Sequence, residues 1–311
     1  MIEIEGLTKR YRDQTVVDDV WMTVPTGTIA VLVGTSGSGK STLLRMINRL
    51  VTPTAGRVVI DGRDTASVPE HELRRRIGYA IQGHGLFPHR TVAENIATVP
   101  RLLAWPKPRV AARVEELLDL FQLEPAEFAQ KYPHQLSGGQ QQRVGVARAL
   151  AAEPELLLMD EPFGALDVII RGKAQDDLLA IQRRFKTTIV LVTHDMEEAF
   201  RLGDRIAVMS EGRLLQHAAP EEIVVRPADD FVARLTGTSD RAFKLLALAT
   251  AGEAAEPGTA SGPAIPAETS LRDALAEIVW AGTEALPVAA NDGTPLGRVT
   301  LRGIVARGRH P

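Results

Sequence analysis

A glycine-rich segment that contains one lysine follows a short apolar run near the N-terminus. The run Ile29 to Val33 leads directly into Gly34-Thr-Ser-Gly-Ser-Gly-Lys-Ser41, which matches the pattern G-x-x-x-x-G-K-[ST]. The three glycines allow the backbone to curl so that successive N–H groups point inward, and a helix that starts near Lys40 adds its positive dipole end. The pattern predicts a phosphate-binding loop formed by Gly34, Thr35, Ser36, Gly37, Ser38, Gly39, Lys40, Ser41 and Thr42.

Two side chains of this loop suit a bound polyphosphate and its metal ion. Lys40 would bridge the terminal phosphates as a point charge. The Ser41 hydroxyl would ligate Mg²⁺, which prefers oxygen ligands and keeps several waters. The competing interpretation is an ordinary glycine-rich turn, which the position of the whole pattern directly after a strand disfavours.

Two carboxylates follow another buried run. Leu156 to Met159 is expected to be a short strand, and Asp160 and Glu161 come directly after it. Asp160 is placed to hold Mg²⁺ directly or through water, and Glu161 can polarise a water for in-line attack on a terminal phosphate. An isolated Asp-Glu pair is more often a solvated strand end. The phosphate loop on another strand favours a shared site, because ligands bind at the carboxyl edge of such sheets.

The phosphate loop and the two carboxylates can share one site only if a sheet brings the ends of several strands together. Short apolar runs are expected to form buried strands at Ile29–Val33, Leu156–Met159 and Ile189–Thr193. They alternate with helical patterns such as 109–122, whose apolar face is formed by Val110, Val114, Leu117, Leu118 and Phe121. Residues 1–236 are therefore expected to form an α/β domain with a largely parallel sheet, beside an antiparallel pair at Met1–Gly6 and Arg57–Asp61.

The composition of the 311 residues excludes several classes of protein. A total of 36 Lys and Arg against 39 Asp and Glu gives a net charge of -3, so no basic excess points to nucleic acid as a partner. The absence of cysteine excludes disulfides, thiol catalysis and Cys-bound metal centres. Neither a secretory signal nor an apolar run long enough to span a bilayer is recognised, so any membrane role is expected to need a partner protein.

The composition shifts after the first domain. Residues 237–267 are rich in Ala, Gly, Pro, Thr and Glu and are expected to be a flexible linker. A small unit over 268–311 is expected to follow. In it, Ser270 caps a helix with Leu271, Leu275 and Ile278 on its apolar face, and strands follow at 285–288 and 296–300.

The sequence Leu136-Ser-Gly-Gly-Gln140 lies between the two phosphate motifs. With them it makes residues 1–236 resemble the ATP-binding-cassette (ABC) ATPases, whose signature is LSGGQ. Ser137, Gly138, Gly139 and Gln140 stand at an expected helix N-terminus, where a hydroxyl and backbone N–H groups can face an anion. The resemblance implies that this anion is the γ-phosphate of ATP bound with Mg²⁺ to a second copy of the chain, in a head-to-tail dimer.

The resemblance assigns four further residues. Tyr11 stands where the family stacks an aromatic ring on adenine, and Gln82 resembles the glutamine that contacts Mg²⁺ or the attacking water. Asp167 resembles a residue of the loop that touches the opposite subunit, and His194 resembles the histidine that hydrogen-bonds the γ-phosphate. Val168 departs from the pattern, because related cassettes usually have proline there.

The resemblance also implies an architecture and a branch of the family. Its members have a RecA-like α/β core, an antiparallel β subdomain and a helical subdomain. Residues 78–100 look like importers of glycine betaine, choline and carnitine, and 270–307 resemble a single CBS (cystathionine-β-synthase-type) motif. Such motifs normally work in pairs, so dimerisation or a vestigial role for this unit is an alternative to regulation by nucleotide or ionic strength.

The sequence therefore favours an ATPase subunit, at the cytoplasmic face of the membrane, that powers import of quaternary amine compatible solutes. Its expected partners are transmembrane permease subunits and, indirectly, an extracytoplasmic substrate-binding protein, with no nucleic acid. One alternative is an importer for another amine or amino acid. A soluble cassette acting on ribosomes or DNA is disfavoured by the single cassette and the lack of heptads. A nucleotide sensor would not need both Glu161 and His194.

Overall fold

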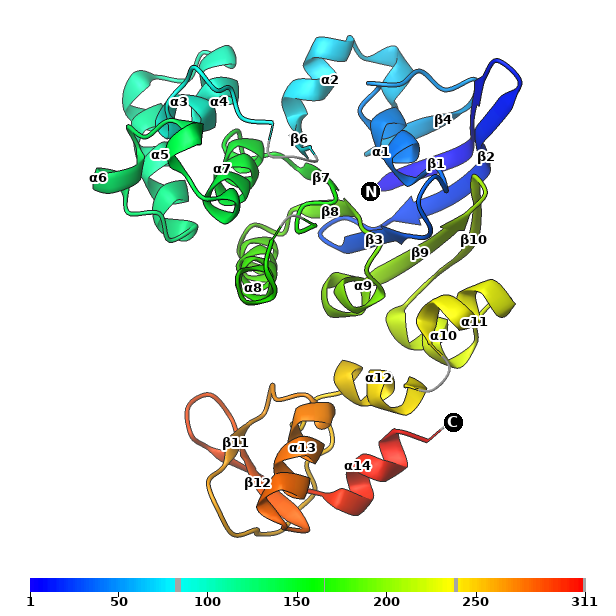
Figure 1. The fold of residues 1–311 in the computed structure, drawn as a ribbon, viewed down its shortest axis with the longest axis vertical. Coiled ribbons are helices and arrows are strands. Elements are labelled where there is room, and N and C mark those ends of the chain that lie inside the picture. Colours follow the sequence, from blue (N-terminus) through cyan, green and yellow to red (C-terminus); the bar gives the residue numbers. More distant parts are fainter. Residues whose placement is uncertain (82–84, 165, 238–239, 310–311) are drawn as a thin grey trace. The chain divides into compact units, whose positions relative to one another are not determined.

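Parallel strands form the centre of the N-terminal unit, as the apolar runs predicted. The computed structural model describes residues 1–81, 85–164, 166–237 and 240–309, and the chain divides into two compact units, Met1–His217 and Ala218–Pro311. The central sheet has the strand order β10-β9-β3-β8-β7-β6 (Figure 1). Its strands are β3 (Ile29–Val33), β6 (Ile77–Ala80), β7 (Leu156–Asp160), β8 (Thr188–Val192), β9 (Arg205–Ser210) and β10 (Arg213–Ala218). All pairs from β9 to β6 are parallel, which confirms the α/β core.

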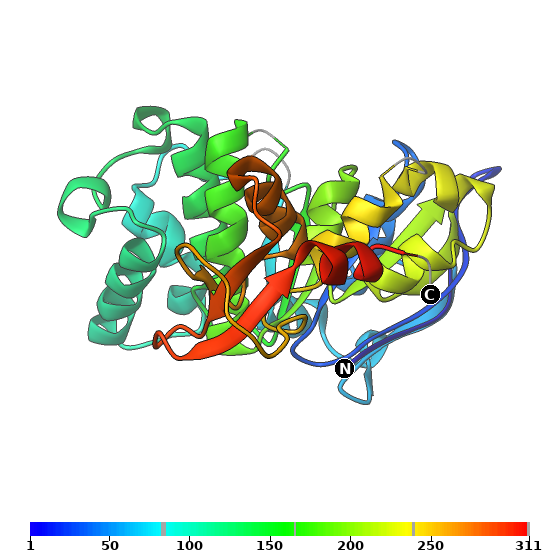
Figure 2. The same ribbon diagram turned by 90° about the horizontal axis from the view of Figure 1, so that it is seen from below.

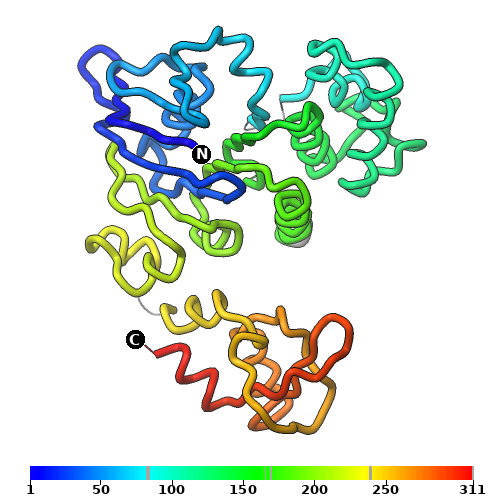
Figure 3. Tube along the Cα trace, turned by 180° about the vertical axis from the view of Figure 1, so that it is seen from behind, coloured from blue at the N-terminus to red at the C-terminus, as the bar shows by residue number. Residues whose placement is uncertain are grey.

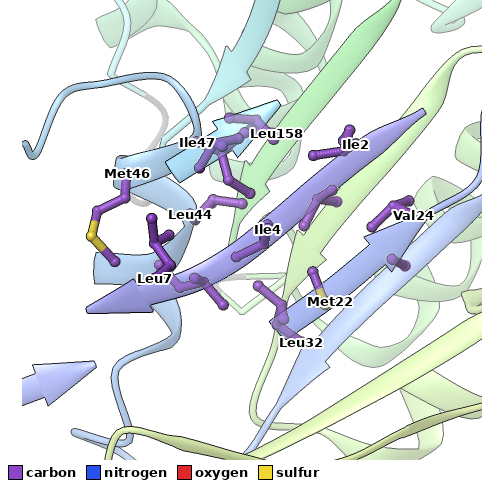
Figure 4. Packing of buried hydrophobic residues seen from close by; sticks show 14 of the residues in the cluster. Ile2, Ile4, Leu7, Met22, Val24, Leu32, Leu44, Met46, Ile47 and Leu158 are labelled. Atoms are coloured by element: carbon purple, nitrogen blue, oxygen red, sulfur yellow. The ribbon is translucent and has the colours of Figure 1, made fainter. Parts of the chain in front are cut away.

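A second, antiparallel sheet packs on the same core. Its order is β2-β1-β4-β5, with β1 (Ile2–Tyr11), β2 (Gln14–Val24), β4 (Ala55–Ile60) and β5 (Arg63–Asp64). Strand β1 pairs antiparallel with both β2 and β4, as the sequence predicted for the first strand and 57–61. Helix α1 (Lys40–Ile47) contributes Leu44 to a buried cluster that also holds Ile4 of β1 and Leu158 of β7 (Figure 4). This shared core fixes the start of α1 relative to both sheets.

Helices connect the strands of the first unit. They are α2 (Glu70–Arg76), α3 (Val92–Ile96), α4 (Thr98–Leu102), α5 (Lys107–Leu120), α6 (Pro125–Phe128), α7 (Gly138–Leu150), α8 (Val168–Phe185) and α9 (Met196–Leu202), with 3-10 turns at Thr65–Ser67 and Pro133–Gln135. The apolar face predicted over 109–122 belongs to α5 and its C-cap and is buried. Helices α3 and α5 pack on α7, so α3 to α7 form a helical part of this unit (Figure 3). Within the described ranges, no helix is both long and apolar enough to cross a membrane.

The C-terminal unit combines helices with a small sheet. Its helices are α10 (Pro220–Val225), α11 (Asp230–Thr236), α12 (Arg241–Leu248), α13 (Leu271–Ala281) and α14 (Leu301–Arg307). Its strands, in the order β11-β12-β13, are β11 (Ile265–Pro266), β12 (Ala285–Ala289) and β13 (Pro295–Thr300) (Figure 2). Ser270 caps α13 by accepting a hydrogen bond from the N–H group of Asp273, and Leu271 and Ile278 are buried, as predicted.

The structure differs from the flexible linker predicted over 237–267. Residues 241–248 form α12, and Ala251 is fully buried in the same apolar cluster as Leu246. The backbone N–H of Gly252 also donates to the carbonyl of Ala267 at 2.8 Å. Alanine side chains are small enough to pack closely between α12 and α13 and lose no rotamer entropy, so a segment of low hydrophobicity still joins a core. The chain divides after His217 rather than after residue 236.

Candidate functional site

The carboxyl ends of three neighbouring strands bring the predicted groups together. Strands β3, β8 and β7 lie side by side and run parallel. The glycine-rich loop follows β3, one residue separates the end of β8 from His194, Asp160 ends β7 and Glu161 comes directly after it. Because these ends share one edge of the sheet, the loop, the histidine and the carboxylates face a common region.

The backbone of the loop requires glycine at two positions. Gly34 has a φ of 150°, and a Cβ atom there would lie 2.0 Å from the carbonyl oxygen of Met209. Gly39 has a φ of 96°, and its Cβ atom would lie 2.4 Å from the carbonyl oxygen of Val16 in β2. The loop therefore passes close to β9 and to the β1–β2 hairpin before α1 begins at Lys40. Any side chain at these two positions would displace the loop from its neighbours.

The Lys40 side chain turns back into the loop. Its Nζ atom donates to three loop oxygens, the carbonyls of Gly34 (2.9 Å) and Thr35 (2.8 Å) and the hydroxyl of Ser38 (3.3 Å). Lys40 is 6% exposed, and burial lowers its pKa, while the charges of Glu161 and Asp160 oppose that shift. The ammonium group is thus held inside the loop, where a phosphate can replace the loop oxygens as its partner.

A hydroxyl and a carboxylate form the predicted metal position. The Ser41 hydroxyl donates to Oδ1 of Asp160 at 2.7 Å, and Asp160 is 1% exposed. Both groups supply hard oxygen ligands, which is the donor chemistry that Mg²⁺ prefers. Two protein ligands leave further coordination positions for phosphate oxygens and waters. The residues present therefore fit Mg²⁺.

Arg45 also lies at this position, next to Asp160, and the sequence analysis did not predict it as a site residue. Its guanidinium group lies 3.3 Å from Oδ2 of Asp160 and hydrogen-bonds Tyr79. The hydrogen bond with Tyr79, more than the charge of Asp160, raises the pKa of Arg45. The spacing of Ser41 and Arg45 was the available signal, because residues four apart lie on one face of a helix. Only the fold shows that this face meets Asp160.

Glu161 and His194 meet beyond the strand ends. Glu161 has a φ of 48°, a left-handed conformation that is uncommon for a residue with a side chain and is often found at functional sites. Its N–H group donates to the carbonyl of Val192 in β8 at 3.0 Å. Its Oε1 atom lies 3.8 Å from Nδ1 of His194. The structure thus places the two residues predicted to act on the terminal phosphate next to each other.

The predicted adenine-contacting residue lies on the β1–β2 hairpin. Tyr11 ends β1 and is 48% exposed, with Nζ of Lys9 4.9 Å from the centre of its ring. The same hairpin touches the phosphate loop, since Val16 packs against Gly39. An exposed ring on a hairpin that approaches the loop is suited to stacking on a flat base.

The remaining predicted segments lie at two helix N-termini. Ser137 caps α7, because its hydroxyl accepts from the N–H of Gln140 at 3.3 Å and the Gln140 side chain accepts from the Ser137 N–H at 2.9 Å. The Ser137 hydroxyl still has its own proton to donate. Asp167 accepts from the N–H of Ile170 at the start of α8 at 3.1 Å. Gln82 lies outside the described residues.

Helix α9, which follows His194, contains a buried carboxylate that supports a pH-dependent prediction. Glu198 is 5% exposed and accepts from Nε2 of Gln175 at 3.0 Å, and burial raises its pKa. At pH 7 the native carboxylate bears a desolvation cost that the unfolded state lacks. Glu198→Gln is therefore expected to raise the melting temperature at pH 7 by roughly 2 °C, which corresponds to a gain on the order of 1 kcal/mol.

The gain from Glu198→Gln is expected to shrink as the pH falls through the raised pKa of Glu198. In that range the wild-type side chain takes up a proton in the native state, so the two proteins become alike in charge. Calorimetric melting curves of both proteins between pH 7 and pH 4 would measure this. A gain that stays constant across the range would contradict the assignment of the cost to a buried charge.

Comparisons with known proteins agree with this geometry. The model of the ABC transporter family matches residues 17–164. The "Glycine betaine uptake system ATP-binding protein YehX" of Escherichia coli is 47% identical over 98% of this chain and 99% of its own length. The "Osmoprotectant import ATP-binding protein OsmV" of Salmonella typhimurium is 45% identical over 100% of this chain and 84% of its own length.

A solved structure shares the arrangement of the first unit. It is the dimeric, post-hydrolysis state of the ATP-binding cassette MJ0796 bound to ADP and Pi, which matches with a TM-score of 0.65 and 34% identity. The match covers 70% of this chain and 98% of that chain. The matching fold, the family model and the full-length relatives lead to one assignment. The chain belongs to the ABC transporter family and is one of its ATP-binding proteins.

Proposed function

We propose that this chain is the ATP-hydrolysing subunit of an importer for quaternary amine compatible solutes of the glycine betaine, choline and carnitine type. One observation carries the proposal. The Ser41–Asp160 pair and the Glu161–His194 pair stand at neighbouring strand ends beside the phosphate loop. The substrate class is supported by the two full-length relatives, which are named for glycine betaine uptake and osmoprotectant import.

The residues of the site have different roles in ATP hydrolysis. Lys40 and the loop N–H groups bind and orient the phosphates, while Ser41 and Asp160 would hold Mg²⁺, which neutralises charge on the phosphate oxygens. Glu161 accepts a proton from the attacking water. His194, 3.8 Å from that carboxylate, donates a hydrogen bond to the terminal phosphate.

A second copy of the chain is proposed to complete the site. Ser137, Gly138 and Gly139 stand at the N-terminus of α7, where the hydroxyl and N–H groups can bind the γ-phosphate held by the partner copy. Asp167 is proposed to act at the contact with that copy. Gln82 is proposed to contact Mg²⁺ or the attacking water and to signal to the permease. Support comes from the MJ0796 cassette, whose solved structure is dimeric. Closure of two copies around ATP is then driven by binding, because the phosphates contact both copies only when they are closed.

The proposed setting is the cytoplasmic face of the membrane, where permease subunits bind the ATPase and a substrate-binding protein delivers the solute from outside. Residues 268–311 are proposed, from the sequence, to form a single CBS-like motif. Dimerisation and regulation by nucleotide or ionic strength are both compatible with its helix and strands. Recognition of the solute is proposed to reside in the permease subunits and the substrate-binding protein.

Uptake of radiolabelled glycine betaine and choline would test the proposed function. Cells that lack this protein would receive either the wild-type gene or the Lys40→Ala variant as an inactive control. We expect wild-type cells to take up at least one solute on the order of tenfold faster than cells with the variant. Equal uptake of both solutes in the two strains would refute the substrate class and leave the ATPase assignment intact.

A further inference from the structure

Helices α8 and α9 are joined by a row of polar side chains. Arg171 donates from Nη1 to Oδ2 of Asp195 at 3.5 Å and from Nη2 to the carbonyl of Leu166 at 3.1 Å. Deeper along the same helices, Gln175 donates to Glu198 at 3.0 Å. Arg171 is therefore the member of the row that reaches beyond the helices, because Leu166 belongs to the loop before α8.

The two acceptors of Arg171 are neighbours of two predicted site residues. Leu166 directly precedes Asp167, and Asp195 directly follows His194. Asp167 itself directly precedes α8, and the Arg171 N–H donates to the Asp167 carbonyl at 2.8 Å. One guanidinium group thus connects the loop proposed to meet the partner copy with the loop that carries the phosphate-contacting histidine.

We propose that Arg171 is a positioning residue for ATP hydrolysis. It holds two pairs of residues in a fixed relative position: Leu166 and Asp167 before α8 (the Asp167 loop), and His194 and Asp195 before α9 (the His194 loop). The inference rests on the proposed function, since it concerns the same reaction. When the His194 loop approaches the γ-phosphate, Arg171 carries the Asp167 loop with it. The partner-facing loop then takes its place only when ATP occupies this copy.

The hydrogen bonds of Asp195 distinguish this role from a simple tie between helices. Its Oδ1 atom accepts from the N–H groups of Glu197 (2.9 Å) and Glu198 (3.3 Å) and so caps α9. Its Oδ2 atom faces Arg171. Each carboxylate oxygen has one task, so the cap and the link to Arg171 can be separated by substitution.

The hydrogen bonds of Arg171 are incomplete in this arrangement. Its Nε atom is buried and lacks a hydrogen-bond partner among the described residues, and its contact with Asp195 is long for an ion pair. An unsatisfied buried donor costs free energy, so the guanidinium group gains from any movement that completes its contacts. The link is thus able to tighten when the two loops move together.

Two substitutions test the proposal in the full-length chain. Arg171→Ala removes both contacts, whereas Asp195→Asn keeps Oδ1 for the cap of α9 and turns the attraction to Arg171 into an unfavourable pairing of two donors. We expect either change to lower kcat roughly tenfold while the Kd for ATP changes less than about threefold. The double variant should be no slower than the slower single variant, because both changes break one link.

The matched control is Arg201→Ala. Arg201 of α9 bonds Asp176 of α8 at 2.7 Å, so it joins the same helices without touching either loop. We expect its kcat to stay within about twofold of wild type. A control variant as slow as Arg171→Ala would show that holding the helices together is what counts and would overturn the proposal.

Other outcomes are equally decisive. Asp195→Asn with wild-type kcat would overturn the proposal even if Arg171→Ala fails to fold, since the capped α9 is intact in that variant. Additive losses in the double variant would also overturn it. Wild-type protein without ATP hydrolysis would refute the proposed function together with this inference, whereas active wild type with unaffected variants refutes this inference alone.

Discussion

Glu161→Gln is expected to lower the rate of ATP hydrolysis by about a hundredfold to ten-thousandfold, while the Kd for ATP stays within about threefold. The amide has the shape of the carboxylate but cannot take the proton of the attacking water. Because the substitution leaves the phosphate loop intact, ATP should still bind and hold two copies together. Steady-state kcat, ATP affinity and gel filtration with and without ATP would measure the three expectations.

A matched control for this variant is Glu153→Gln. Glu153 also adopts a left-handed backbone conformation, with a φ of 55°, and it pairs with Arg109 at 3.1 Å just before β7 begins. It therefore precedes the strand whose other end carries Glu161. We expect kcat within about twofold of wild type for this control. Sustained turnover by Glu161→Gln would rule out Glu161 as the group that takes the proton.

Lys40→Ala is expected to weaken binding of ATP by about a hundredfold, which corresponds to roughly 2.7 kcal/mol. The ammonium group is buried in the loop, where desolvation lowers its pKa and its Nζ atom donates to oxygen atoms of Gly34, Thr35 and Ser38. Its interaction with phosphate is charge-assisted and poorly screened there. Calorimetric titration with ATP and Mg²⁺ would measure the loss.

A second readout for Lys40→Ala is thermal stability. ATP in excess of its Kd should raise the melting temperature of the wild-type protein, and this increase should largely vanish in the variant. Lys107→Ala, which removes an exposed lysine at the start of α5, should keep the full increase. Unchanged affinity and unchanged stabilisation in Lys40→Ala would mean that phosphate binds elsewhere than in the loop at 34–42.

The sequence alone determined those parts of the site whose sequence patterns lie within one short stretch of the chain. The strand before Gly34, the helix from Lys40, the buried strand before Asp160 and the N-cap at Ser137 were all predicted, and the structure has them. Each depends on neighbours along the chain, such as a run of apolar residues, a glycine with positive φ or a capping hydroxyl. The resemblance to the family added His194, which carries no local signal of its own.

Only the tertiary structure decided which of these parts touch. Ser41 contacts Asp160 because β3 and β7 both pair with β8. No local sequence pattern specifies this strand order. The contacts of Arg45 with Asp160 and of Arg171 with Asp195 likewise arise from helices packed across long stretches of chain. The prediction of a flexible linker differs from the structure for the same reason, since Ala251 is buried in a cluster with apolar residues from several elements of the C-terminal unit. Local chemistry is fixed by adjacent residues, whereas burial and long-range pairing depend on the free energy of the whole packed core.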